Sequence, residues 1–174
     1  GRYVLTSSES GQRFWSLENE AELMRIDGLT SGIVGMASSP DGRALLTQEW
    51  NGPLTLWDLA TGHKIRVLGE TQNTYSSIAF SPDGRRVVFN SRPGDFIQDI
   101  SELCPTRDSH LIMVDVDTGE VLWQATEPTG FVRKPVFTGD GSRVLTNNRR
   151  CDSFITVWDA ATGEKIGEWE GHQS

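Results

Sequence analysis

The chain has 174 residues, 36% of them hydrophobic, 9% aromatic and 23% charged, and its formal net charge is −8. This composition is ordinary for a globular protein, and no apolar run approaches the roughly 18 residues that a membrane-spanning helix requires. The acidic balance disfavours duplex nucleic acid, because phosphates demand a concentrated basic face. We therefore expect neither a membrane nor a nucleic-acid partner. The chain opens on Gly1-Arg2-Tyr3 without the pattern of a signal peptide, which favours a cytoplasmic protein.

Short apolar and alternating runs separated by turn residues predict strands throughout the chain. In chain order, the first strands are expected at residues 2–6, 13–17 and 22–26. The next are expected at 33–38, 44–48, 54–59 and 64–68, followed by 77–81, 86–90, 111–116 and 120–125. The last are expected at 132–138, 143–147, 154–160 and 165–170. Asp-Gly and Thr-Gly pairs supply the turns, because Gly takes positive φ without steric cost and Asp can bond its own backbone.

The turns recur in a fixed order. Ser-Pro-Asp-Gly at residues 39–42 returns at 81–84 and, as Thr-Gly-Asp-Gly, at 138–141, so 42 residues separate the first two copies and 57 the next two. Asp-x-x-Thr-Gly stands at 58–62, 115–119 and 159–163. A repeat of this length with several strands indicates a stacked array, since one unit cannot bury its own apolar faces. The strands therefore form three four-stranded units and one unit that lacks its first strand.

These landmarks resemble those of the WD-repeat family of β-propellers over essentially the whole chain. They are Leu-Trp-Asp at 56–58, Val-Trp-Asp at 157–159, the Ser-Pro-Asp-Gly corners, the Thr-Gly turns and Glu-Gly-His at 170–172. The resemblance implies an all-β propeller segment of four-stranded antiparallel blades, in which the first strand of each blade lines a central channel. Blades are expected at about residues 1–28, 29–70, 71–126 and 127–174, the first without its inner strand.

The chain departs from the family pattern in two places. His172 alone keeps the Gly-His that precedes an inner strand, and Val114 replaces the Trp of one Trp-Asp pair. The hydrogen-bonded set of Trp, Ser or Thr, His and Asp that braces regular blades is therefore expected to be mostly absent. Four blades are also fewer than the roughly six to eight usual in the family. Either the remaining blades of a longer chain or self-association is expected to close the ring.

Strand parity predicts a core between the blades. Neighbours such as Val136 and Phe137 are both included, because inner strands are expected to be covered on both faces. The expected core residues are Ile33, Leu46, Trp57, Ala79, Phe80, Val88, Val114, Val136, Phe137, Leu145 and Trp158.

The resemblance also implies which end of the blades binds partners. In the family, the Asp-Gly and Thr-Gly corners lie on one face of the ring, and partners most often dock on the opposite face, at the d–a and b–c connections between strands. One b–c connection inserts residues 91–110, where Phe96, Ile100 and Leu103 repeat at helical spacing, so a short helix is expected there, as a docking element or a local lid. Aromatic and Arg side chains dominate many interfaces, and the candidate binding residues are Trp50, Tyr75, Arg92, Phe96, Phe131, Arg133 and Arg149.

The cysteines and histidines give little support to a metal or catalytic site. Cys104 and Cys151 are expected on one face of adjacent blades, either as a disulfide or as two free thiols. His110, Asp108 and Asp152 could join them around a metal, but the short paired spacing of structural zinc ligands is missing. No motif places a nucleophile or a partner carboxylate beside any of the three histidines. We expect no metal, no cofactor and no enzyme activity.

The favoured interpretation is a non-catalytic scaffold that binds a protein or peptide, as part of a larger propeller protein. Two alternatives stay open. Residues 115–123 resemble the blade signature of quinoprotein-type propellers, in which a Trp after Thr-Gly docks against the next blade, and Glu168-Trp169 is a partial second instance. That family implies an oxidoreductase with pyrroloquinoline quinone. The chain could also be the accessory propeller of a multidomain enzyme.

Overall fold

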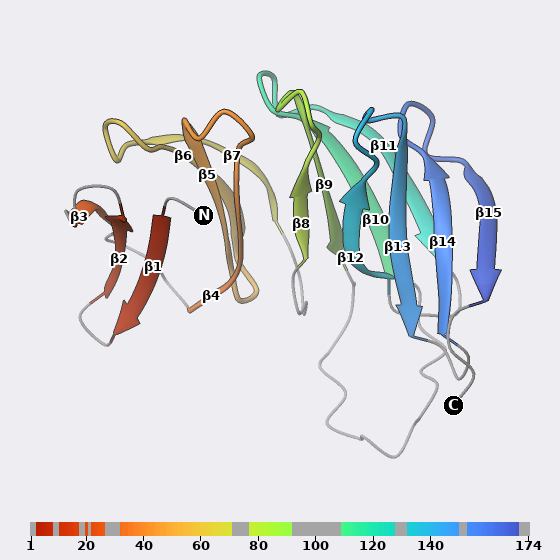
Figure 1. Cartoon of the computed structure of the whole chain (residues 1–174), viewed down its shortest axis with the longest axis horizontal. Helices are drawn as coiled ribbons and strands as arrows, with labels where there is room; N and C mark the ends of the chain where they lie inside the picture. Colours follow the sequence, from red (N-terminus) through yellow and green to blue (C-terminus); the bar gives the residue numbers. More distant parts are fainter. Residues whose placement is uncertain are drawn as a thin grey trace, which may run out of the picture.

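The computed structural model describes residues 3–8, 11–17, 20, 22–26, 32–70, 77–91, 109–127, 132–149 and 153–170 (Figure 1). Within these ranges the regular structure is entirely β-strand, arranged in four antiparallel sheets. The first sheet has the order β1-β2-β3, formed by β1 (Tyr3–Ser8), β2 (Gly11–Ser16) and β3 (Glu22–Ile26). No helix of these ranges is long and apolar enough to cross a membrane.

The other three sheets have four strands each, in sequential order. The second sheet contains β4 (Ile33–Ser38), β5 (Ala44–Glu49), β6 (Pro53–Asp58) and β7 (Lys64–Glu70). The third contains β8 (Ile78–Phe80), β9 (Arg86–Ser91), β10 (Ser109–Asp115) and β11 (Val121–Glu127). The fourth contains β12 (Val132–Phe137), β13 (Arg143–Arg149), β14 (Ser153–Asp159) and β15 (Lys165–Glu170). The expected fold class, an all-β segment of antiparallel propeller blades, is confirmed.

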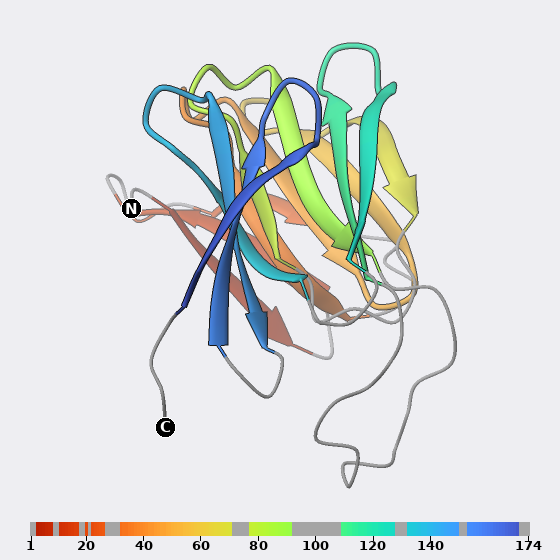
Figure 2. The same ribbon diagram turned by 90° about the vertical axis from the view of Figure 1, so that its right-hand side faces the viewer.

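The sheets lie side by side, and the first strands of neighbouring sheets come closest. β4 lies beside β8, and β8 lies beside β12. The Asp-Gly corners and Thr-Gly turns of the last three sheets gather at one end, the upper end of Figures 1 and 2. The arrangement is that of consecutive propeller blades in an open arc.

The repeated corners are held by the residues that the repeat supplies. In the first corner, the Ser39 hydroxyl donates to the Asp41 carboxylate at 2.6 Å, and the same carboxylate accepts the Arg43 amide at 3.0 Å. Gly42 has φ 71°, which a β-carbon would strain. The other two corners repeat these bonds, with Thr138 in place of serine in the last. A short local sequence therefore sets the angle at which each first strand meets its second.

Two apolar clusters fill the space between the sheets. The cluster between the second and third sheets includes Leu46, Leu54, Leu56, Leu68, Val87, Phe89 and Val114. The cluster between the third and fourth sheets includes Val88, Leu111, Met113, Trp123, Val144, Trp158 and Ala160. Consecutive residues Val87 and Val88 face opposite clusters, so the third sheet is covered on both faces.

The expected core is mostly correct and wrong at one position. Leu46, Val88, Val114 and Trp158 are buried, and the following are partly buried: Ile33, Trp57, Ala79, Phe80, Phe137 and Leu145. Val136 is 50% exposed. Phe137 packs on the cluster shared with the third sheet, and its neighbour Val136 faces the other way. The far face of the fourth sheet is uncovered there, so assuming two covered faces was the error.

Candidate functional site

The end of the blades opposite the corners was expected to bind partners, and Trp50 lies there. Trp50 follows β5 directly, in the b–c connection of the second sheet, and is half-buried. Its amide donates to the Gly32 carbonyl at 3.0 Å, which ties this connection to the start of β4. Asn51 has φ 50°, and the Gly52 amide returns to the Glu49 carbonyl at 3.2 Å, closing a tight turn.

Arg133 and Arg149 lie at this same end, on neighbouring strands of the fourth sheet. Arg133 pairs with Asn147 across β12 and β13, and Arg149 is the last residue of β13, opposite Ser153. Their backbones therefore lie on paired strands, at the edge that carries the b–c connection.

The remaining candidates lie outside the described residues: Tyr75, Arg92, Phe96 and Phe131, together with Cys104, Cys151 and the expected helix. The expected insertion at 91–110 needs one correction at its ends. Ser91 belongs to β9, and Ser109 and His110 belong to β10, where His110 pairs with Ser91. The pairing of these strands continues one rung further than the sequence indicated, and it shortens the connection to residues 92–108.

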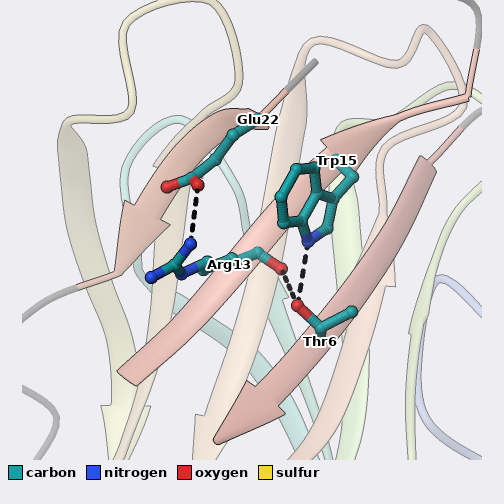
Figure 3. Close-up of polar contacts among 4 residues, drawn as sticks. All are labelled: Thr6, Arg13, Trp15 and Glu22. Carbon is teal, nitrogen blue, oxygen red and sulfur yellow. Dashed lines mark hydrogen bonds and ion pairs between the residues drawn. The ribbon is translucent and has the colours of Figure 1, made fainter. Parts of the chain in front are cut away.

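A Trp-to-Thr hydrogen bond braces the first, second and fourth sheets. Trp15 Nε1 donates to Thr6 Oγ1 at 2.9 Å in the first sheet, where Arg13 also meets Glu22 at 3.3 Å (Figure 3). The bonds from Trp57 to Thr47 and from Trp158 to Thr146 are both 2.8 Å.

The expectation that this brace is mostly absent was therefore wrong for its Trp and Thr members. The threonine lies on the strand preceding the Trp, nine to twelve residues away, so no contiguous motif contains both. In the third sheet the register places Val114 and Phe89 at these two positions, and both are buried without the bond.

The acidic turn residues are used by the turns themselves. Asp58 accepts the amides of Thr61 and Ala60 and the Thr61 hydroxyl, and the first of these bonds is the main reason that its pKa is lowered. Asp140 accepts the Thr138 hydroxyl and then the Ser142 amide, which lower its pKa to about 2. Among the described residues no group of three His, Cys, Asp or Glu side chains is placed to hold a metal ion. These carboxylates are structural groups.

Two side chains of the third sheet bind the fourth sheet at the end of the blades that carries the corners, and we call such a boundary between neighbouring sheets a seam. Trp123, on β11, is 9% exposed, and its Nε1 donates to the Ala160 carbonyl at 3.2 Å. Its ring lies directly over Gly163, where an added β-carbon would be 2.6 Å from the ring. Arg86, on β9, donates to the carbonyls of Ala160 and Gly141, both at 3.1 Å. Its guanidinium lies 5.8 Å from the centre of the Phe137 ring.

The equivalent seam between the second and third sheets contains a cavity of about 500 Å³. Apolar groups from both sheets contribute to its walls: Ala44, Leu56, Phe80 and Val116. Charged residues also line it: Asp41, Arg43, Arg66, Asp83 and Asp117. No sequence pattern predicted this cavity, because its walls come from the corners and turns of two separate blades.

Comparison with known proteins finds similarity to WD-repeat proteins. No protein-family profile matches it. It is 23% identical over 175 residues to WD repeat-containing protein SL1-17 of Schistosoma mansoni, covering 98% of this chain and 52% of that protein. It is 25% identical to the periodic tryptophan protein 2 homolog of Dictyostelium discoideum, covering 96% of this chain and 17% of that protein.

A third relative is eukaryotic translation initiation factor 3 subunit I of Scheffersomyces stipitis. The identity is 22% over 177 residues, which covers 95% of this chain and 47% of that protein. The chain thus spans about half the length, or less, of the curated relatives it matches. All three relatives are WD-repeat proteins, and the similarity runs through nearly all of this chain.

Proposed function

We propose that the chain is a segment of a WD-repeat β-propeller and acts as a non-catalytic scaffold that binds a protein or peptide, because its relatives are WD-repeat proteins and its sheets are arranged as propeller blades. The binding surface is the end of the blades that carries the b–c and d–a connections. The chain acts there as part of a larger propeller whose further blades cover the outer face of the fourth sheet. The location we propose for it is the cytoplasm.

One observation carries this proposal. Arg133 and Arg149 lie on paired strands at the b–c end of the fourth sheet, and Trp50 lies in the b–c connection of the second. The sheets beneath them are braced by Trp-to-Thr bonds and by buried apolar clusters, so side chains at this end can vary without disturbing the blades. Arg and Trp are the residue types that most often dominate interface energetics.

The proposed partner class agrees with the names of the relatives. One relative is named as a subunit of a translation initiation factor, which is an assembly of several chains. A partner that is itself a protein is therefore the class we propose for this chain.

The quinoprotein alternative rests on Trp123, which docks on the next blade as that signature predicts. The Trp123 side chain is buried between the third and fourth sheets, and its indole N–H donates to the Ala160 carbonyl. Trp169, the partial second instance, is 55% exposed on the face of the fourth sheet that we propose further blades cover. The Trp123 contact packs one blade on the next, which a scaffold also requires, so it does not favour the quinoprotein interpretation over the proposed one.

The test is charge reversal at each end of the blades. Arg92→Glu with Arg149→Glu changes the proposed binding end, and Lys64→Glu with Arg85→Glu is the matched control at the corner end, where both side chains are exposed. Proteins retained by the full chain are quantified by mass spectrometry for each variant. We expect the first pair to lose specific partners with nearly unchanged melting temperature, and the control to keep them. Loss of partners in the control pair alone would place binding at the wrong end.

A further inference from the structure

The cavity between the second and third sheets occupies a position that, at the next seam, is filled by an arginine. Blades two, three and four are built on the same corner and turn, so each seam should present similar groups. Comparing the two seams residue by residue shows which groups are shared and which group is missing. The chain itself therefore indicates what the cavity fits.

Arg86 occupies the filled seam. Its backbone amide donates to the Ser81 hydroxyl and its carbonyl accepts the Ser81 amide, both at 2.9 Å. From this fixed start its side chain crosses to the fourth sheet, where it reaches the carbonyls of Gly141 and Ala160 and the face of Phe137. Two carbonyl oxygens and an aromatic face form a receptor for a planar cation.

Ala44 holds the equivalent position in the open seam. Its amide donates to the Ser39 hydroxyl and its carbonyl accepts the Ser39 amide, again both at 2.9 Å. The backbone frame is the same, but the side chain ends at the β-carbon and cannot cross to the third sheet. The space that a longer side chain would fill is part of the cavity.

The receptor groups are nevertheless present on the facing sheet. Phe80 directly precedes the corner of the third sheet, as Phe137 precedes the corner of the fourth. Gly84 is equivalent to Gly141, because the amide of each donates to the carbonyl of the first corner residue, Ser81 or Thr138. Val116 is equivalent to Ala160, because the amide of each donates to the carbonyl of the residue that follows the corner glycine. In the described part of the chain, no hydrogen bond reaches the carbonyl of Gly84 or of Val116.

The charges that line the cavity also favour a cation. Three residues with carboxylates line the cavity, Asp41, Asp83 and Asp117, and two with guanidinium groups, Arg43 and Arg66. Arg66 stands where Trp123 stands at the next seam, eight residues after the turn aspartate, and its side chain lies beside Gly119. Its Nε is buried without a hydrogen-bond partner. Arg43 and Arg66 would favour an anion, and a glutamate peptide tests for that outcome.

We propose that this cavity receives the guanidinium of an arginine side chain from a partner peptide, in the way that Arg86 fills the next seam. The guanidinium donates to the carbonyls of Gly84 and Val116, and it lies over the face of Phe80. The site is at the opposite end of the blades from the proposed binding surface. If the arginine site is absent, the proposed binding surface is unaffected, and if the proposed binding surface is wrong, the arginine site is unaffected.

The first test measures binding of acetyl-Gly-Arg-Gly-amide to the full chain by isothermal titration calorimetry. The matched probes replace arginine by citrulline, which keeps the shape without the charge, and by glutamate. We expect one site for the arginine peptide and at least about tenfold weaker binding of citrulline, because two charge-assisted hydrogen bonds are weakened. Free L-arginine is expected to bind no more tightly than the peptide.

The second test uses substitutions that fill the cavity at position 44 and a substitution that creates a second cavity at position 86. Ala44→Arg should abolish binding of the arginine peptide and raise the melting temperature relative to Ala44→Met, which fills the cavity without donors. Arg86→Ala should open an equivalent space at the next seam and raise the stoichiometry from one peptide to two. If Arg86→Ala does not fold, the comparison at position 44 still decides.

Three results would overturn the proposal. The first is equal binding of arginine and citrulline peptides, or no binding of either. The second is tighter binding of the glutamate peptide, which would assign the cavity to an anion held by Arg66. The third is tighter binding of free L-arginine than of the peptide, which would make the cavity a small-molecule site.

Discussion

The packing of Trp123 on Gly163 makes a sharp prediction about one added methyl group. Gly163→Ala places a β-carbon 2.6 Å from Cδ2, 2.7 Å from Cε3 and 3.0 Å from Cγ of Trp123. The position also has φ 76°. Gly119→Ala is the matched control, because Gly119 ends the equivalent turn with φ 77° and its nearest neighbours are 3.9 Å away. The two substitutions share the backbone strain and differ in the collision.

The magnitudes follow from these two contributions. An alanine in the left-handed region costs about 1–2 kcal/mol, which is the full cost expected for Gly119→Ala. Overpacking a buried contact adds about 1–3 kcal/mol, so Gly163→Ala should lose that much more. For a chain of this size the extra loss corresponds to roughly 2–12 °C in melting temperature. The ring of Trp123 cannot easily retreat, because it is buried and hydrogen-bonded to the Ala160 carbonyl.

The assay is urea unfolding of the full chain followed by far-ultraviolet circular dichroism, which does not depend on the tryptophans being replaced. Trp123→Ala alone should cost about 3–5 kcal/mol. In that background Gly163→Ala should cost no more than Gly119→Ala, since the collision is gone, and the double-mutant cycle should give about 1–3 kcal/mol of coupling. Equal losses for the two glycine variants in the native background would refute the described packing of this seam.

Two further predictions concern bonds within single sheets. Trp158→Phe removes the donor to the hydroxyl of Thr146, a residue that is 2% exposed, and the unpaired hydroxyl should lower the free energy of unfolding in urea by about 1–3 kcal/mol. Adding Thr146→Val removes that hydroxyl and should recover part of the loss, so no recovery would contradict the bond. Asp140 has a folded pKa of about 2 against an ordinary 3.8, so the unfolded chain binds the proton first, and the stabilisation it gives should be lost as the pH falls from about 4 to about 2. Asp140→Asn should flatten the acid-unfolding profile in that window, and an unchanged profile would show that the carboxylate does not make these bonds.

Much of the fold could be predicted from the sequence because its determinants are local. Alternation along a strand and the residues of a turn lie within ten residues of each other, so the bounds of β3, β4 and β15 agree with expectation to the residue. The same local chemistry predicted positive φ at the corner and turn glycines. Of the candidate binding residues, Trp50, Arg133 and Arg149 lie in or beside the connections that the repeat predicted.

The errors have a common physical cause. Val136 was expected inside because parity cannot tell whether a sheet is covered on one face or two. The Trp-to-Thr braces were missed because strand pairing, and not a contiguous motif, brings their partners together.

The sequence by itself determined the strands, the turns and the repeat of like blades, since these depend on neighbours along the chain. The tertiary structure decided how one blade meets the next. Trp123 reaches Ala160 across 37 residues and Arg86 reaches it across 74, and no local pattern connects such positions. The same frame carries Arg86 at one seam and Ala44 at the other, and stacking the sheets turns that difference into a filled contact in one case and part of a cavity in the other.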